Sequence, residues 1–357
     1  MAIITQRGLD AISRGVVSPH LTLAALGGII LADADGLRVH DNLIQGHGVS
    51  HLRPVCGIYV LHGENVVIEN NRIRANGPRA AGDAATGLRA GIALQLVGRR
   101  VITDTRAPTE VETDTFLPAA RVRGNVVNQP AGRALQVYGL GPMFIEGNVL
   151  VSEGPGVDAT SDTTGQCVDI QNIGQSPELV TMGWIPSDLG FFPAPPLLYD
   201  PVPLGLVDDR FVDGRILFTD NQVRFNPVES ESTGIFCATR LQSYGDIAVQ
   251  DNQFLVKFTD AGGSMVFDTT VTAWSTRTAN NRWEDPAIED PPGTFQTDTS
   301  LTTLGMMNIT ALNQATRCIH VAVSPSSPVT TNNPVDNNQT YTDCAGGGSL
   351  GGLLAPP

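Results

Sequence analysis

Hydrophobic and polar residues alternate in short runs along most of the chain, and turn-forming residues separate the runs. Between Gly57 and Ile73, apolar residues at alternate positions form two runs, and the second contains the pair Asn70-Asn71. A period of two is typical of a strand with one buried face, and Asn favours a sharp bend of the backbone. This stretch therefore predicts a unit of two short strands closed by an Asn turn.

The same unit recurs at a fixed spacing. The first residue of the strand and the last Asn of the turn are 14 residues apart from Gly28 to Asn42, from Gly57 to Asn71 and from Ala134 to Asn148. Looser copies run from Gly234 to Asn252 and from Ser264 to Asn281. A repeat of about 30 residues is typical of stacked architectures. The sequence predicts an all-β solenoid of about 8 to 10 coils.

Two further features recur with the same spacing as the repeat. A turn-forming residue stands before each Asn: Asp41, Asn70, Gly124, Gly147, Asp220, Asp251 and Asn280. Paired apolar residues lie two and four positions before it: Leu37/Val39, Val66/Ile68, Met143/Ile145, Ile216/Phe218 and Ile247/Val249. In the first strand, the second and fourth positions are apolar and should face the core, so the third and fifth should face outward.

A solenoid grows along one axis, so we expect the 357 residues to form one elongated domain. Residues 20–323 should form the solenoid, and residues 1–19 should cap its open first coil. Residues 324–357 are rich in Ser, Pro, Asn and Gly and should form an irregular tail.

Two coils break the spacing. Gly91 to Asn125 covers 34 residues and Cys167 to Asn221 covers 54. The excess predicts insertions at about residues 99–118 and 174–213, both between the first and second strands of their coils. These coils flank the regular coil that begins at Ala134. Long loops without structure of their own are usually either functional or disordered. Because both insertions leave at the same corner, we expect them to form two walls of one groove.

The outward residues between these walls are Gln95, Gln136, Tyr138, Asp169 and Gln171. Amides, a phenol and a carboxylate suit a hydroxyl-rich ligand, and an aromatic ring offers an apolar face to a sugar. Trp184, in the second insertion, could close over such a ligand. The alternative is structural, because rows of Gln also hydrogen-bond to one another along stacked strands.

The formal net charge of −14 argues against binding to nucleic acid or to an anionic membrane surface. No apolar run has the roughly 20 residues of a membrane span. The run from Leu21 to Ala34 fits the strand pattern, so we expect no signal peptide.

The five cysteines are scattered and lack the spacing of a zinc site, so we expect buried free thiols and no bound metal. A disulfide between Cys318 and Cys344 remains open.

The repeat resembles those of the right-handed parallel β-helix superfamily, which includes pectate lyases, polygalacturonases, epimerases and phage tailspikes. The resemblance covers about residues 20 to 323 and concerns architecture. It implies a single right-handed parallel β-helix, a polysaccharide partner and an extracellular or surface-associated location. It says little about activity.

Catalysis by a hydrolase of this superfamily would need paired carboxylates. Asp169 with Asp208 or Asp209 is the best pair that the sequence offers. Gly46-His47-Gly48 and Arg72-Ile73-Arg74 are similar to polygalacturonase motifs, but the adjacent Asp pair of that family is missing. A lyase would bring Ca²⁺ with it; otherwise the sequence predicts no cofactor.

Two functions follow from these features. In the first, the groove binds a polysaccharide, with or without lyase, hydrolase or epimerase activity. In the second, the rod is a non-catalytic structural or adhesive module of an extracellular or virion-like assembly. Homo-oligomer or assembly contacts would then involve residues 174–213 and the tail.

Overall fold

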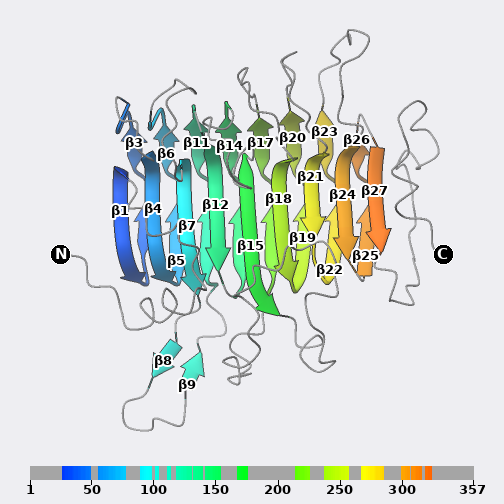
Figure 1. The fold of residues 1–357 in the computed structure, drawn as a ribbon, viewed down its shortest axis with the longest axis horizontal. Helices are drawn as coiled ribbons and strands as arrows, with labels where there is room; N and C mark the ends of the chain where they lie inside the picture. Colours follow the sequence, from blue (N-terminus) through cyan, green and yellow to red (C-terminus); the bar gives the residue numbers. More distant parts are fainter. Residues whose placement is uncertain are drawn as a thin grey trace, which may run out of the picture.

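The computed structural model describes residues 26–49, 55–77, 89–98, 101–103, 111–113, 118–130, 132–139, 141–153, 167–175, 214–225, 237–256, 267–284, 299–305, 307–315 and 318–323. Strands and turns make up these segments, and none of them is helical. Three parallel sheets, A, B and C, contain nearly all the strands, which stack side by side along the long axis (Figure 1). In this part of the chain, no helix could cross a membrane.

Successive strands of the chain visit the three sheets in turn. In one coil, β4 (Val55–Glu64) lies in sheet A, β5 (Val66–Glu69) in sheet B and β6 (Arg72–Arg74) in sheet C. The chain then returns to sheet A at β7 (Ala90–Gly98), which is parallel to β4. The coil thus has three strands where the sequence predicted two, because a third strand follows the Asn turn. This arrangement is compatible with a parallel β-helix.

The strand order in each sheet follows the chain. Sheet A contains β1 (Leu26–Asp35), β4, β7, β12 (Arg133–Gly139), β15 (Val168–Gln175), β18 (Cys237–Tyr244), β21 (Phe267–Thr272), β24 (Thr299–Gly305) and β27 (Cys318–Val323). Sheet B contains β2 (Arg38–His40), β5, β10 (Ala120–Arg123), β13 (Met143–Glu146), β16 (Ile216–Thr219), β19 (Asp246–Gln250), β22 (Ser275–Ala279) and β25 (Met307–Ala311). Sheet C contains β3 (Leu43–Gln45), β6, β11 (Val126–Gln129), β14 (Val149–Ser152), β17 (Gln222–Phe225), β20 (Gln253–Val256), β23 (Arg282–Glu284) and β26 (Gln314–Ala315).

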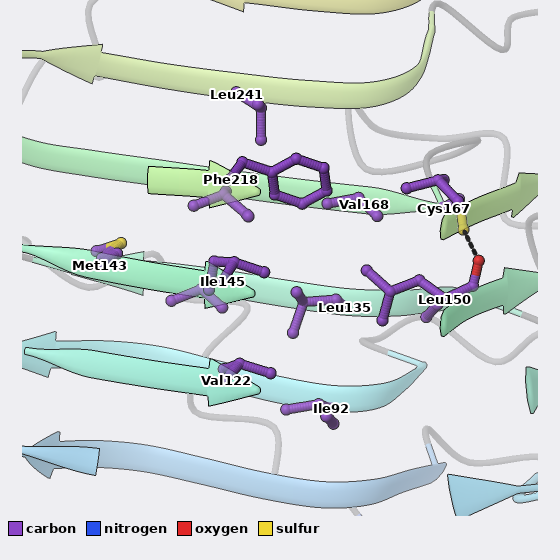
Figure 2. Close-up of a cluster of buried hydrophobic side chains, with 14 of the residues drawn as sticks. Ile92, Val122, Leu135, Met143, Ile145, Leu150, Cys167, Val168, Phe218 and Leu241 are labelled. Carbon is purple, nitrogen blue, oxygen red and sulfur yellow. Dashed lines mark hydrogen bonds between the residues drawn. The ribbon is translucent and has the colours of Figure 1, made fainter. Parts of the chain in front are cut away.

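One hydrophobic core runs between the sheets. Figure 2 shows Leu135 and Val168 of sheet A, Met143 and Ile145 of sheet B, and Leu150 of sheet C within it. All five are fully buried. These side chains alternate along their strands with outward residues, as the sequence predicted. The predicted pairs at the ends of the sheet B strands, such as Val66/Ile68, also point inward.

The glycine at the start of the sheet A strand reflects close packing between sheets. A Cβ at Gly57 would lie 2.3 Å from Cγ2 of Ile73 in sheet C and 2.7 Å from the carbonyl oxygen of Gly91 in the next coil. The side chain of Ile73 thus leaves no room for a Cβ at the first position of this sheet A strand, which explains the glycine there.

The Asn turns lie between sheets B and C. The residue before each Asn adopts a left-handed conformation, with φ between 53° and 62° at Asp41, Asn70, Gly124, Gly147, Asp220, Asp251, Asn280 and Leu312. Gly, Asn and Asp accept this conformation most readily, so seven of these turns could be read from the sequence. The eighth, Leu312-Asn313, was missed because Leu is not a turn former.

The sequence misplaced two coils. The sequence predicted that these two sheet A strands begin at Gly234 and Ser264. In the structure Thr239 pairs with Val168 and with Thr269. The residues equivalent to Cys167, the first position of its strand, are therefore Ala238 and Asp268. Ala238 lies 14 residues before Asn252, so the fixed spacing holds for that coil. The segment from Leu301 to Val323 also supplies sheet A strands to two coils, β24 and β27, instead of one.

Both gaps that the sequence assigned to insertions separate a sheet A strand from a sheet B strand. One lies between β7 and β10, and the other between β15 and β16. The flanking coils adjoin β12 on either side. Within the first gap, β8 (Val101–Thr103) and β9 (Val111–Thr113) form an antiparallel pair. Residues 1–25, residues 324–357 and residues 176–213 lie outside the described part, so the proposed cap, tail and second wall stay predictions.

Cys56, Cys167 and Cys237 are buried, and none of the three forms a disulfide. Burial raises the pKa of Cys56 and of Cys167 to about 12. These two thiols are therefore protonated at neutral pH and unreactive. Their burial agrees with the sequence prediction. Cys344 lies outside the described residues.

Candidate functional site

The outer face of sheet A carries two parallel rows of side chains. The third position of each strand forms the foundation row: Tyr59, Ala93, Gln136, Asp169, Arg240 and Thr270. On β7, β12, β15, β18 and β21 the fifth position forms the amide row: Gln95, Tyr138, Gln171, Gln242 and Thr272. The pairing between Gln95 and Tyr138 is irregular, because the register of β7 with β12 shifts there. The amide row is nearer the end of each strand, where the chain leaves for sheet B.

The two rows differ in exposure. In the foundation row, Gln136 is 3% exposed and Asp169 is fully buried. In the amide row, Tyr138, Gln171, Gln242 and Thr272 are half-buried, and Gln95 is 1% exposed. The sequence predicted one open floor for both rows. The structure corrects this, because only the amide row reaches the surface along most of its length.

Asp169 is the centre of a buried network that joins three strands. Its carboxylate accepts hydrogen bonds from Arg240, with Nε at 2.9 Å from Oδ1 and Nη2 at 2.8 Å from Oδ2. The hydroxyl of Tyr138 donates to Oδ2 at 2.6 Å, and Nη2 of Arg133 lies 3.4 Å from the same atom. Nε2 of Gln171 donates more weakly to Oδ1 at 3.4 Å. The carboxylate oxygens are thus fully occupied.

This network determines the protonation of Asp169. Burial acts to raise the pKa of the carboxyl, but the charges of Arg240 and Arg133 outweigh it and lower the pKa to about 2. Burial, followed by the charge of Asp169, raises the pKa of Tyr138. At neutral pH the carboxylate is ionised and the phenol is protonated, so this pair stores no proton that Asp169 could donate as a general acid.

Gln95 is unusual within the amide row. Neither Oε1 nor Nε2 of its side chain has a hydrogen-bond partner in the described part of the chain, although the residue is almost fully buried. A buried amide without a partner costs about 1–3 kcal/mol. Such a group is a candidate for a hydrogen bond to a ligand.

The structure brings together five of the predicted site residues. Gln95, Gln136, Tyr138, Asp169 and Gln171 all lie on β7, β12 or β15, and Gln136 and Asp169 alternate with the core residues Leu135, Val137, Val168 and Ile170. Their roles in catalysis or ligand binding stay predictions. Asp208, Asp209 and Trp184 lie outside the described residues.

Four residues of this face were missed from the sequence. Arg240, Gln242 and Thr272 lie on the two misplaced coils, and Arg133 precedes the repeat position Ala134. Counting 14 residues back from Asn252 gives Ala238, which would have placed Arg240 and Gln242 in the two outward positions. The fixed spacing was thus the missing signal for these two residues.

The motif that resembles a polygalacturonase site lies elsewhere. Arg72 and Arg74 project from β6 on the outer face of sheet C, and His47 follows β3 of the same sheet. No group of three or more His, Cys, Asp or Glu in the described segments could hold a metal ion.

Comparison of the chain with protein-family models, with curated proteins and with solved structures found no match.

Proposed function

We propose that the protein is a right-handed parallel β-helix that binds a linear, hydroxyl-rich polysaccharide along the amide row of sheet A. The observation that carries the proposal is the unpartnered side-chain amide of Gln95, at the end of this row. A sugar hydroxyl both donates and accepts hydrogen bonds, so it could satisfy either atom of that amide.

The remainder of the row supports the same ligand class. Tyr138, Gln171, Gln242 and Thr272 are half-buried and uncharged, and neighbouring strands are about 4.8 Å apart. The row therefore offers regularly spaced hydrogen-bonding groups and one aromatic ring to a chain that lies along the molecule. An uncharged row favours a neutral sugar chain at this face.

The foundation row has a supporting role in this proposal. Asp169 uses its oxygens to hold Arg240 and Tyr138, and the short bond to Tyr138 fixes the orientation of the phenol. A hydrolase, lyase or epimerase reaction would need a proton donor or acceptor with a pKa nearer neutrality than that of Asp169. We therefore propose binding at this face and assign no reaction to it.

The test uses the full-length chain and an array of neutral glycans. Replacing Gln171 and Gln242 by Ala should abolish retention, because the row loses two adjacent amides. Gln95→Met should also weaken retention while the free energy of unfolding rises by about 1 kcal/mol, since the buried amide is removed. Weaker retention together with a higher free energy of unfolding would show that Gln95 contacts the ligand, because a residue with only a structural role would lower both when it is replaced.

A matched control is the Thr219→Ala/Gln250→Ala variant, which removes two half-buried polar residues from the outer face of sheet B. It should bind like the wild type. Equal retention by all variants, or no glycan retained by the wild type, would contradict the proposal and favour the structural or adhesive module.

A further inference from the structure

Sheet C presents a positively charged outer face on an acidic protein. Its outward residues, called the arginine face here, include Arg72, Arg74, Arg224 and Arg282 and a single acid, Glu284. All five are exposed. The face therefore has a formal charge of +3, whereas the whole chain has −14.

Three of the four arginines have no acidic partner within the described part of the chain. Glu284 is bound to Arg282, with 2.6 Å between Oε1 and Nε. Arg74 donates to the neutral amide of Gln45 at 2.7 Å. Arg72 and Arg224 have no acidic partner among the described residues. By contrast, Arg123 on sheet B lies between Glu69 and Glu146 on neighbouring strands, so the charges there compensate.

The spacing of the arginines indicates what the face could bind. Arg72 and Arg74 lie three strands from Arg224, or about 14 Å, and Arg224 lies two strands from Arg282, or about 10 Å. Between them the outward residues are aliphatic or amide, such as Val126, Asn128 and Gln222. The face matches a linear polymer with widely spaced anionic groups and neutral units between them.

Nucleic acid fits the arginine face poorly. A nucleic acid strand carries one phosphate about every 3.4 Å, which is far denser than these arginines. Stacking of bases on aromatic side chains is typical of single-strand binding. The described outward residues of sheet C include no aromatic side chain, because Phe225, Phe254 and Trp283 point into the core.

A second copy of the chain is also a poor partner for this face. Pairing two copies through the same face would bring arginines against arginines, which is unfavourable. We propose that the arginine face binds a linear polysaccharide that bears carboxylate or sulfate groups. This is a second site, with a ligand of different charge from that of the amide row.

The experiment compares the wild type with an Arg72→Gln/Arg74→Gln variant. Hyaluronan carries one carboxylate in each disaccharide and κ-carrageenan carries one sulfate in each disaccharide, so both have neutral sugars between their charges. Affinity is measured for both polymers at several salt concentrations. The wild type should bind at least one of them, with affinity that falls as salt rises. The variant should bind on the order of tenfold more weakly. The slope of log affinity against log salt concentration should also become shallower by roughly one for each arginine that no longer binds an anionic group.

The matched control is Arg38→Gln/Arg277→Gln, which removes the same charge from exposed positions on sheet B. It should change affinity by no more than roughly twofold, because screened charges at a distance contribute little. Equal weakening by both variants would overturn the proposal, since only the overall charge would then matter.

Two other results would also overturn the proposal. One is failure of the wild type to bind either polyanion. The other is tighter binding to a single-stranded oligonucleotide, or to phosphatidylcholine vesicles containing phosphatidylserine, than to hyaluronan and κ-carrageenan. The Gln171→Ala/Gln242→Ala variant should retain polyanion binding, so failure here is distinguishable from failure of the amide-row proposal.

Discussion

Leu312 adopts the left-handed backbone conformation. At the equivalent position of the other seven turns the residue is Gly, Asn or Asp. The φ of Leu312 is 55°, and its side chain is 58% exposed. The left-handed conformation costs a residue with a bulky side chain about 1–2 kcal/mol. The turn forms nevertheless, because Asn313 at the next position binds into the stack.

We expect Leu312→Asn to stabilise the protein by about 1 kcal/mol, because Asn tolerates the left-handed conformation better than Leu. Urea unfolding followed by circular dichroism measures the change. Ile309→Asn, at an exposed strand position of the same coil, should give no gain. If both variants gain the same stability, the cause is the replacement of an exposed apolar side chain by a polar one, and the conformational explanation is wrong.

Between strands, the network around Asp169 joins β12, β15 and β18 through buried charges. A buried ion pair contributes little net stability, but removal of one partner is costly. The network therefore specifies how the sheet A strands are placed relative to one another, and it makes stability depend on pH.

Asp169 has a pKa of about 2 in the folded protein and an ordinary pKa of about 3.9 when unfolded. Its contribution is thus present above about pH 4 and is lost as the pH falls toward 2, with a size of about 2 kcal/mol. We expect Asp169→Asn to flatten the decrease in unfolding free energy over this range, although it lowers stability at neutral pH. Unfolding with urea at a series of pH values measures this slope.

Thr219→Ala provides the control, since Thr219 is a half-buried residue without a charge on the outer face of sheet B. It should leave the slope between pH 4 and 2 as in the wild type. Parallel curves for wild type and Asp169→Asn would show that Asp169 is not the group that titrates.

Across the whole molecule, a ladder of eight asparagines runs from Asn42 to Asn313. At Asn148, both the backbone N and Nδ2 donate to Oδ1 of Asn221, at 3.0 and 2.9 Å. Nδ2 of Asn221 donates in turn to the carbonyl oxygen of Ile145 at 2.8 Å. Each Asn thereby ties its own turn to the neighbouring coils.

The cost of losing a ladder residue should depend on its place in the stack. Asn221→Ala leaves the buried donors of Asn148 without an acceptor, so we expect a loss of about 3 kcal/mol or more. Asn42 is exposed in the first described coil, and Asn42→Ala should cost about 1 kcal/mol or less. Thermal and urea unfolding of both variants would measure the difference, and equal losses would contradict the role of burial.

The repeat itself could be read from the sequence because it depends on local physics. Alternating apolar residues predict buried strand faces, and Gly, Asn or Asp before each ladder Asn predicts the left-handed turn. The fixed distance from Ala134 to Asn148 then identified outward positions such as Gln136 and Tyr138. The starts that were expected at Gly234 and Ser264 departed from this distance and were wrong, whereas the residue 14 positions before Asn252 is Ala238, the equivalent position in the structure.

By itself, the sequence determined the all-β class, the stacked coils and which side of most strands faces the core, because these depend on residues close together in the chain. Only the tertiary structure determined which side chains meet across coils. Asp169 and Arg240 are 71 residues apart and become neighbours through parallel pairing of β15 with β18. The buried network, the unpartnered amide of Gln95 and the arginine face on sheet C all depend on such pairing, which alternation along one strand does not encode.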